Sequence, residues 1–293
     1  MRHDTEIAKR LFPKKYREGL LFAAPTLIGL VLFFIIPFIF VVIFSFTKGL
    51  GTSRFVGLSN YIDVFKSSAF LLAATNTLKF LAVSIPAIII VSFIIAITIH
   101  NNLNSNKFYR TILLFPLVLP IASLVMLVHV FFSQGGIINT WLSYFGYNEA
   151  NWLTGPSSFW ILVAIYIWKF TGYNVILFLS GLNMIFIEYY QIADIEGATT
   201  WDKFRWLTLP LMRNSLFFTV VISIINSFKI YREAFMIAGK HPNDSIYFLQ
   251  HFLINNFENL NYQRLSVAAL FLFALIFLIL FFYYSFNTKN EDD

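Results

Sequence analysis

The decisive stretch of this sequence is Gln191-Ile192-Ala193-Asp194-Ile195-Glu196-Gly197-Ala198, followed by Leu207-Thr208-Leu209-Pro210. Residues 187–205 can be helical, because three- and four-residue spacing relates Ile187, Tyr190, Gln191, Asp194 and Ile195. Gly197 can end or bend that helix. A second short helix is expected over 200–207, beginning with a Thr-x-x-Lys pattern rather than a capping box, and Pro210 is expected to open the next apolar helix.

The composition around this polar segment is that of a membrane protein. Of the 293 residues, 58% are hydrophobic and only 12% are charged, whereas soluble domains are about a quarter charged. Cysteine is absent, which excludes a disulfide framework, thiolate catalysis and a Cys-ligated metal site. The stretch at 191–210 is therefore expected to lie across one face of a membrane, either as an ordinary interfacial connector or as a docking element.

Six apolar stretches approach or exceed the roughly 20 residues that a membrane-spanning helix needs. They lie at about 20–46, 73–99, 111–133, 158–182, 214–236 and 263–285. The first is too long for the apolar part of a signal peptide, so we interpret it as a retained span. The predicted fold is an all-α membrane protein with one six-span domain over 20–285, a basic segment at 1–19 and a tail at 286–293.

The distribution of cations predicts the orientation of these spans. With the N-terminus inside, the segments on the inner side carry twelve Lys and Arg residues and those on the outer side carry five. Because Lys and Arg resist translocation, both termini and the loop at about 184–213 are expected to be cytoplasmic.

Several catalytic motifs are missing from the chain. There is no GxxxxGK[ST] loop for ATP, no HExxH and no GxSxG, and the five histidines are scattered. We therefore expect no catalytic residues, no metal site, no cofactor bound by this chain and no nucleic-acid partner.

Polar side chains inside the predicted spans form a candidate substrate path. An ionisable group in a span costs at least about 2.5 kcal/mol by insertion scales, so it is expected to face a cavity or a partner. The residues are Lys169, Tyr173, Asn226, Lys229 and Glu233. Lys229 and Glu233 are four residues apart and are expected to be neighbours on one helix face.

Two other interpretations of these polar residues remain open. Lys229 and Glu233 could simply hold two helices together. Glu233 and His129 could instead relay protons in a secondary transporter, which would predict two related halves with broken spans; the sequence shows no convincing internal repeat.

The loop resembles the EAA motif of ABC importer permeases: Glu-Ala-Ala, three residues, Gly, nine residues, then Ile-x-Leu-Pro. Here Gly197 precedes nine residues and Leu207-Thr208-Leu209-Pro210, and Gln191-Ile192-Ala193 occupies the Glu-Ala-Ala position. Gln191 replaces the usual Glu and loses its charge. Matching segments elsewhere are Phe55 to Tyr61, Asn76 to Leu78, Phe108 to Thr111, Ser227 to Lys229 and Phe257 to Asn259. They are similar to the first permease subunit of sugar and glycerol-3-phosphate importers.

This resemblance implies a function and a set of partners. The chain would form half of a translocation path with a second permease subunit in a bacterial cell membrane. Two cytoplasmic ATPase subunits would bind ATP and Mg and receive the EAA loops, and an extracytoplasmic binding protein would deliver the solute, a sugar or oligosaccharide. The residues implied to couple to the ATPase are Gln191, Ala193, Asp194, Glu196, Gly197, Ala198, Leu207 and Pro210.

Overall fold

The computed structural model describes residues 14–49, 54–102 and 107–289. The basic segment expected at 1–19 falls mostly outside the described residues, as do residues 290–293 of the expected tail. Helix α2 (Lys14–Leu30), the π-helical turn η1 (Val31–Ile35) and α3 (Ile36–Phe46) form one continuous helical rod, which is apolar from Leu21 onward. The short strands β1 (Thr47–Lys48) and β2 (Arg54–Phe55) pair antiparallel after it.

The rest of the described chain is helical. The elements are α4 (Ser59–Phe65), α5 (Ser68–Asn102), α6 (Lys107–Val118), α7 (Ile121–Phe132), α8 (Ile137–Tyr144), α9 (Ser157–Leu182), α10 (Ile187–Ile195), α11 (Thr200–Asp202), η2 (Lys203–Thr208), α12 (Leu209–Leu211), α13 (Arg213–Ser227), η3 (Phe228–Ile230), α14 (Tyr231–Ala238), η4 (Asp244–Ile246), α15 (Leu249–Glu258) and α16 (Tyr262–Lys289).

Six helical segments of the described residues are long and apolar enough to cross a membrane, which confirms the all-α six-span fold. They are Leu21–Phe46, Ser68–Asn101, Ile121–Tyr144, Ser157–Leu182, Arg213–Ala238 and Tyr262–Ser285. The third differs from the stretch expected at 111–133. That stretch is divided between α6 and α7, because Pro120 adopts an extended conformation (ψ 140°) and begins a new helix.

Helix α9 lies at the centre of the bundle and packs against α5, α6 and α13. Two glycines allow these close crossings. A Cβ atom on Gly172 would lie 1.7 Å from the backbone oxygen of Leu113 on α6, and one on Gly181 would lie 2.2 Å from the hydroxyl of Ser215 on α13. Small residues at such crossings let helix backbones approach closely in membranes.

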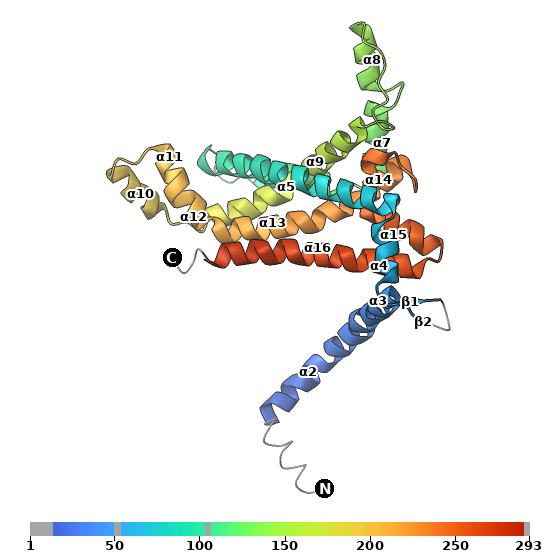
Figure 1. Cartoon of the computed structure of the whole chain (residues 1–293). Helices are drawn as coiled ribbons and strands as arrows, with labels where there is room; N and C mark the ends of the chain where they lie inside the picture. Colours follow the sequence, from blue (N-terminus) through green and yellow to red (C-terminus); the bar gives the residue numbers. More distant parts are fainter. Residues whose placement is uncertain (1–13, 50–53, 103–106, 290–293) are drawn as a thin grey trace.

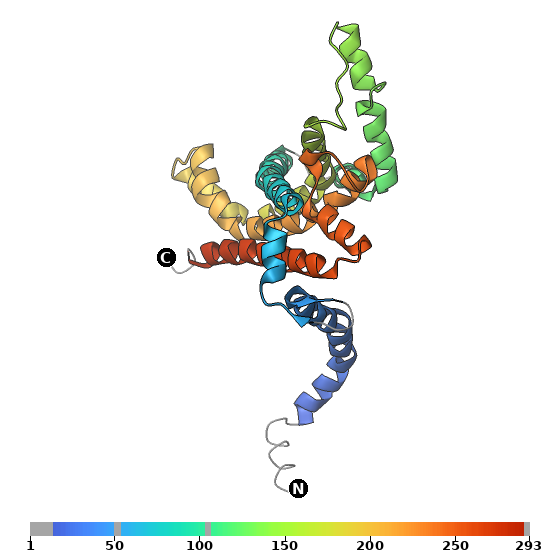
Figure 2. The ribbon, with the colours of Figure 1, turned by 45° about the vertical axis from the view of Figure 1, so that its right-hand side comes forward.

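The rod formed by α2, η1 and α3 extends away from this bundle (Figures 1 and 2). None of its most apolar window is buried within the chain. It is attached mainly at its C-terminal end, where Phe44 packs against Tyr262 at 6.4 Å between ring centroids and the Asn60 amide donates to the carbonyls of Ser45 and Thr47, each at 2.9 Å. Phe38 adds a contact with Phe273.

The bundle has two different ends (Figure 1). Helices α10 to α12 lie at one end, together with the C-terminal end of α16. Helices α7, α14 and α15 lie toward the other end, and α8 projects away from the side of the bundle there, upward in Figure 1.

Candidate functional site

The first arm of the loop, α10, ends in a well-formed Schellman motif. The N–H of Ala198 donates to the carbonyl of Ala193 at 2.9 Å, and the N–H of Gly197 donates to the carbonyl of Asp194 at 3.1 Å. Gly197 has φ +79°, the left-handed conformation that glycine adopts without a steric penalty. Gly197 therefore ends the helix and turns the chain sharply.

The second arm begins at Thr200, as expected, but it does have a capping box. Thr199, rather than Thr200, is the N-cap: its hydroxyl accepts from the N–H of Asp202 at 3.2 Å, and the Asp202 carboxylate accepts from the N–H of Thr199 at 3.0 Å. Hydrogen bonds from the hydroxyl and N–H of Thr199 hold the pKa of the Asp202 carboxyl below its usual value. The expected Thr-x-x-Lys start was wrong because Asp202, not Lys203, occupies the third helical position.

Two side-chain contacts join the arms. Lys203 Nζ lies 2.6 Å from Asp194 Oδ1, and the Tyr190 and Thr208 hydroxyls are 2.9 Å apart. The second arm continues as the π helix η2 and then α12, which contains Pro210, and the span α13 begins only at Arg213. Pro210 thus precedes the span by a short turn instead of opening it.

The implied coupling residues lie on the outside of this paired structure. Gln191, Asp194, Glu196, Gly197 and Pro210 are exposed, while Ala193, Ala198 and Leu207 are half-buried. A groove of about 390 Å³ runs between the arms. It is lined by Ala193, Glu196, Ala198 and Leu207, and also by Tyr189, Ile192, Asp202, Lys203 and Trp206.

Sequence reasoning missed the large apolar members of this groove. Ile192 and Trp206 have 54% and 71% of their surface exposed, and Ile195 and Trp201, elsewhere in the loop, have 85% and 63%. Exposed large apolar side chains on a polar segment indicate a contact surface. Their presence in a polar stretch was a signal available in the sequence.

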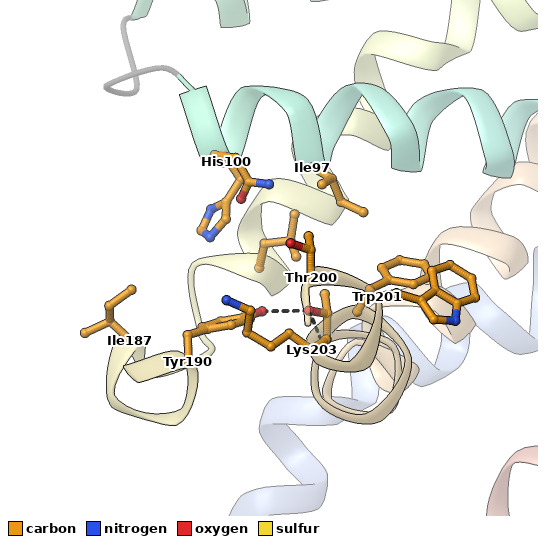
Figure 3. A pocket seen from close by; sticks show the side chains of 11 residues that line it. Ile97, His100, Ile187, Tyr190, Thr200, Trp201 and Lys203 are labelled. Atoms are coloured by element: carbon orange, nitrogen blue, oxygen red, sulfur yellow. Dashed lines mark hydrogen bonds between the residues drawn. The ribbon is translucent and has the colours of Figure 1, made fainter. Parts of the chain in front are cut away.

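A second cavity, of about 790 Å³, separates the loop from the end of α5 (Figure 3). Ile97 and His100 of α5 form one wall, and Tyr190, Trp201 and Lys203 form the other. Beside it, Phe204 packs against Phe93 of α5 at 6.2 Å. The loop is therefore held to α5 at an aromatic contact while much of its inner face is not packed against that helix.

Inside the bundle, the structure brings Lys169 of α9 and Glu233 of α14 together as an ion pair. The two side chains are only 10% and 2% exposed. One carboxylate oxygen of Glu233 has no hydrogen-bond partner. Lys169 also lies 5.6 Å from the ring centroid of Phe170.

Lys229 does not pair with Glu233, contrary to the sequence-based expectation. Its ammonium group donates to Asn226 Oδ1 at 2.8 Å. The reason is the 3₁₀ turn η3, Phe228–Ile230, which separates α13 from α14. Because a 3₁₀ helix has three residues per turn, residues four apart across it no longer share one face.

Other predicted residues lie apart from this ion pair. Tyr173 is half-buried on α9. His129 is exposed on α7 and lines a cavity near α14. Among the described residues, no hydrogen bond joins His129 to Glu233, so the structure does not bring together the two groups of a proton relay.

Three further buried polar residues lie between α9 and α13. The Tyr166 hydroxyl donates to the carbonyl of Ser223 at 2.7 Å, and the Asn174 amide donates to the Ser223 hydroxyl at 2.8 Å. The carbonyl oxygen of the Asn174 side chain is buried without a partner. With Lys169 and Glu233, they form a polar cluster along α9.

Comparison with known proteins shows which family has this sequence and architecture. Residues 88–291 match the family described as the binding-protein-dependent transport system inner membrane component. The lactose transport system permease protein LacF of Rhizobium radiobacter is 30% identical over 231 residues, which are 76% of this chain and 77% of that protein. The arabinooligosaccharides transport system permease protein AraP of Bacillus subtilis (strain 168) is 30% identical over 235 residues, covering 78% and 74%.

The fold also matches a solved structure. A chain in the crystal structure of a bacterial ABC transporter involved in the import of the acidic polysaccharide alginate superposes with a TM-score of 0.78 at 23% identity, covering 96% of this chain and 99% of that one. The family match and the two relatives agree with the resemblance found in the loop. The chain is a multi-pass inner membrane protein that belongs to the family of binding-protein-dependent transport system inner membrane components, the permeases of ABC importers.

Proposed function

We propose that this chain is the permease subunit of an ATP-driven importer for a sugar or oligosaccharide, and that the loop over 184–213 couples it to a cytoplasmic ATPase. Similarity to permeases named for lactose and for arabinooligosaccharides supports the solute class. A solved structure of similar fold is a complex with an alginate pentasaccharide-bound periplasmic protein, which supports delivery by an extracytoplasmic binding protein. ATP and Mg would bind to the ATPase subunits.

The observation that carries the coupling role is the exposed groove between two tightly joined arms. A segment that transmits force must keep its shape when it is pushed. Here the Schellman motif at Gly197, the capping box at Thr199 and the Lys203–Asp194 pair all restrict the turn. Ile192 and Trp206 then offer apolar surface to a partner.

The loop has two connections through which its movement would reach the spans. Met212, which is fully buried, joins it to α13, and the Phe204–Phe93 contact joins it to α5. Both α5 and α13 pack against α9, the helix that carries Lys169. Displacement of the loop would thus shift the helices around the buried polar cluster.

Lys169 and Glu233 of this cluster, together with three polar residues outside it, are our candidates for the part of the path that the chain contributes. Lys169, Tyr173, Asn226, Lys229 and Glu233 would provide charges, an amide and an aromatic hydroxyl along α9 and the broken span α13–α14. A second permease subunit would supply the opposite wall. The rod over Leu21–Phe46, apolar and unburied within the chain, would then contact lipid or that subunit.

ATP-driven sugar uptake by the transporter in proteoliposomes, with its binding protein, tests the coupling role. Ile192→Asp places a charge in the groove and is expected to lower uptake at least tenfold and to reduce recovery of the ATPase subunits with the permease. The matched control is Ile195→Asp, because Ile195 is 85% exposed but does not line the groove. Normal uptake in the Ile192→Asp variant would refute coupling through this surface.

A further inference from the structure

We propose that the cavity at the end of the bundle opposite α10 to α12 is a binding site for a neutral saccharide, separate from the polar cluster on α9. This inference rests on the proposed import function and adds a second contact for the solute. The cavity has a volume of about 770 Å³, within the range of roughly 300–1,000 Å³ typical of small-molecule sites. Its walls come from the C-terminal end of α7, the segments 133–135 and 151–154, and residues 237–238 and 241–243.

The walls are held in place by a buried amide. Asn139 is fully buried; its Oδ1 accepts from the indole N–H of Trp152 at 2.9 Å and from the N–H of Ala150 at 3.1 Å. Its Nδ2 donates to the carbonyls of Ser133, Gln134 and Ala150, each at 3.1 Å. One side chain thus fixes both wall segments, 133–135 and 151–154, relative to each other.

The opposite wall is fixed in the same manner. The Asn243 amide donates to the Ser158 hydroxyl at 3.0 Å and to the carbonyl of Leu153 at 3.3 Å. Asn243 Oδ1 accepts from the N–H of Ser245 at 3.1 Å. The segment 241–245 therefore keeps its position against the start of α9, and the cavity exists before any ligand enters.

The chemistry of the lining fits a sugar. Trp152, whose ring meets Phe132 edge-on at 6.3 Å, provides rigid aromatic surface for the apolar face of a pyranose ring. Gln134 Nε2 donates to Asn151 Oδ1 at 2.9 Å. Among the described residues no group bonds to Gln134 Oε1 or Asn151 Nδ2, so an acceptor oxygen and an amide donor group remain available for sugar hydroxyl groups.

The charge of the lining restricts the ligand further. None of the residues that line the cavity is Asp, Glu, Lys or Arg. Two histidines, His129 and His241, are the titratable groups there. A cavity without a fixed cation gives no compensation for the desolvation of a carboxylate, so we assign it to uncharged saccharides and not to acidic ones.

Titration of the full chain in lipid nanodiscs tests this assignment, with lactose and arabinooligosaccharides as probes and alginate pentasaccharide as the acidic comparison. The neutral sugars are expected to change tryptophan fluorescence. Trp152→Phe should remove that change, whereas Trp160→Phe should keep it, because Trp160 is exposed on α9 outside the cavity.

Affinity measurements on amide variants provide the second arm. Gln134→Ala combined with Asn151→Ala is expected to weaken neutral-sugar binding at least fivefold, while Asn148→Ala, an exposed amide outside the cavity, leaves it unchanged. Near-ultraviolet circular dichroism checks that the fold is kept. Unchanged affinity in the double variant, preference for the acidic probe, or loss of binding-protein docking with unchanged sugar affinity would each overturn the proposal.

These outcomes are distinct from failure of the proposed function. If ATP-driven uptake of a neutral sugar is normal while the double variant keeps its affinity, the import function stands and the cavity is not a saccharide site. If neither probe binds, the cavity assignment is wrong whatever the uptake assay shows.

Discussion

Removal of one member of the Lys169–Glu233 ion pair should destabilise the protein strongly, and removal of both should restore most of the loss. The two side chains are 10% and 2% exposed, so neither charge can be hydrated when its partner is absent. Breaking a buried pair by removing one partner costs about 3–5 kcal/mol, whereas replacing both by apolar residues of similar volume is often neutral or stabilising.

The appropriate cycle is Lys169→Met, Glu233→Leu and the double variant, since these residues approximate the original volumes. Each single change should lower the free energy of unfolding by about 3–5 kcal/mol. At roughly 2–4 °C per kcal/mol for a domain of 150–250 residues, the Tm should fall by on the order of 10 °C. The double variant should unfold close to the wild-type temperature, because the unpaired Glu233 oxygen is removed as well.

Thermal unfolding in nanodiscs, followed by circular dichroism, measures this cycle. A double variant that loses about the sum of the two single losses would show that the pair contributes no interaction energy, and the reasoning would be wrong. Sugar uptake by the stable double variant then separates two roles. Reduced uptake with intact stability would support a role of Lys169 and Glu233 in the substrate path. Unchanged uptake would show that the pair only holds the helices together.

Three further predictions concern the loop and the opposite end of the bundle. Gly197→Val should reduce uptake while Gly197→Asn largely preserves it, because open space surrounds Gly197 and only its φ of +79° excludes a β-branched residue; equal effects in transport assays would contradict this. Lys203→Glu should impair uptake, and Asp194→Lys in the same chain should recover it at low salt if the 2.6 Å pair stiffens the turn. Burial lowers the pKa of His251 to about 4, below the unfolded value of about 6.5. Between these two values the unfolded state binds one more proton than the folded state, so the free energy of unfolding should fall by about 1.4 kcal/mol for each unit by which the pH is lowered. The N–H of Phe248 donates to His251 Nδ1 at 3.1 Å, which requires the neutral ring. Chemical denaturation of the wild type and of His251→Gln between pH 7 and 4 checks this, since only the wild type should show that dependence on pH.

Much of the fold could be predicted because, in a membrane protein, the number and position of the spanning helices follow from the length and hydropathy of the apolar segments. Six apolar helices follow from the need to satisfy every backbone polar group within a span, and the structure confirms them. The helix end at Gly197 was also predictable, since glycine at that position relates directly to a left-handed turn. The break at Pro120 was harder to predict, because α5 and α6 each contain a proline in their interior, Pro86 and Pro116. Proline alone therefore does not identify a helix boundary.

The partners of the buried charges were decided only in three dimensions. Lys169 and Glu233 are 64 residues apart, and the local rule that pairs residues four apart predicted Lys229 instead. That rule assumes a continuous α-helix, and η3 interrupts it. The sequence by itself determined how many spans exist, where the polar loop lies along the chain and which residues are too polar to face lipid. The tertiary structure determined which of those residues meet, because the crossing of α9 with the broken span α13–α14 sets their distances, and no sequence period encodes such a crossing.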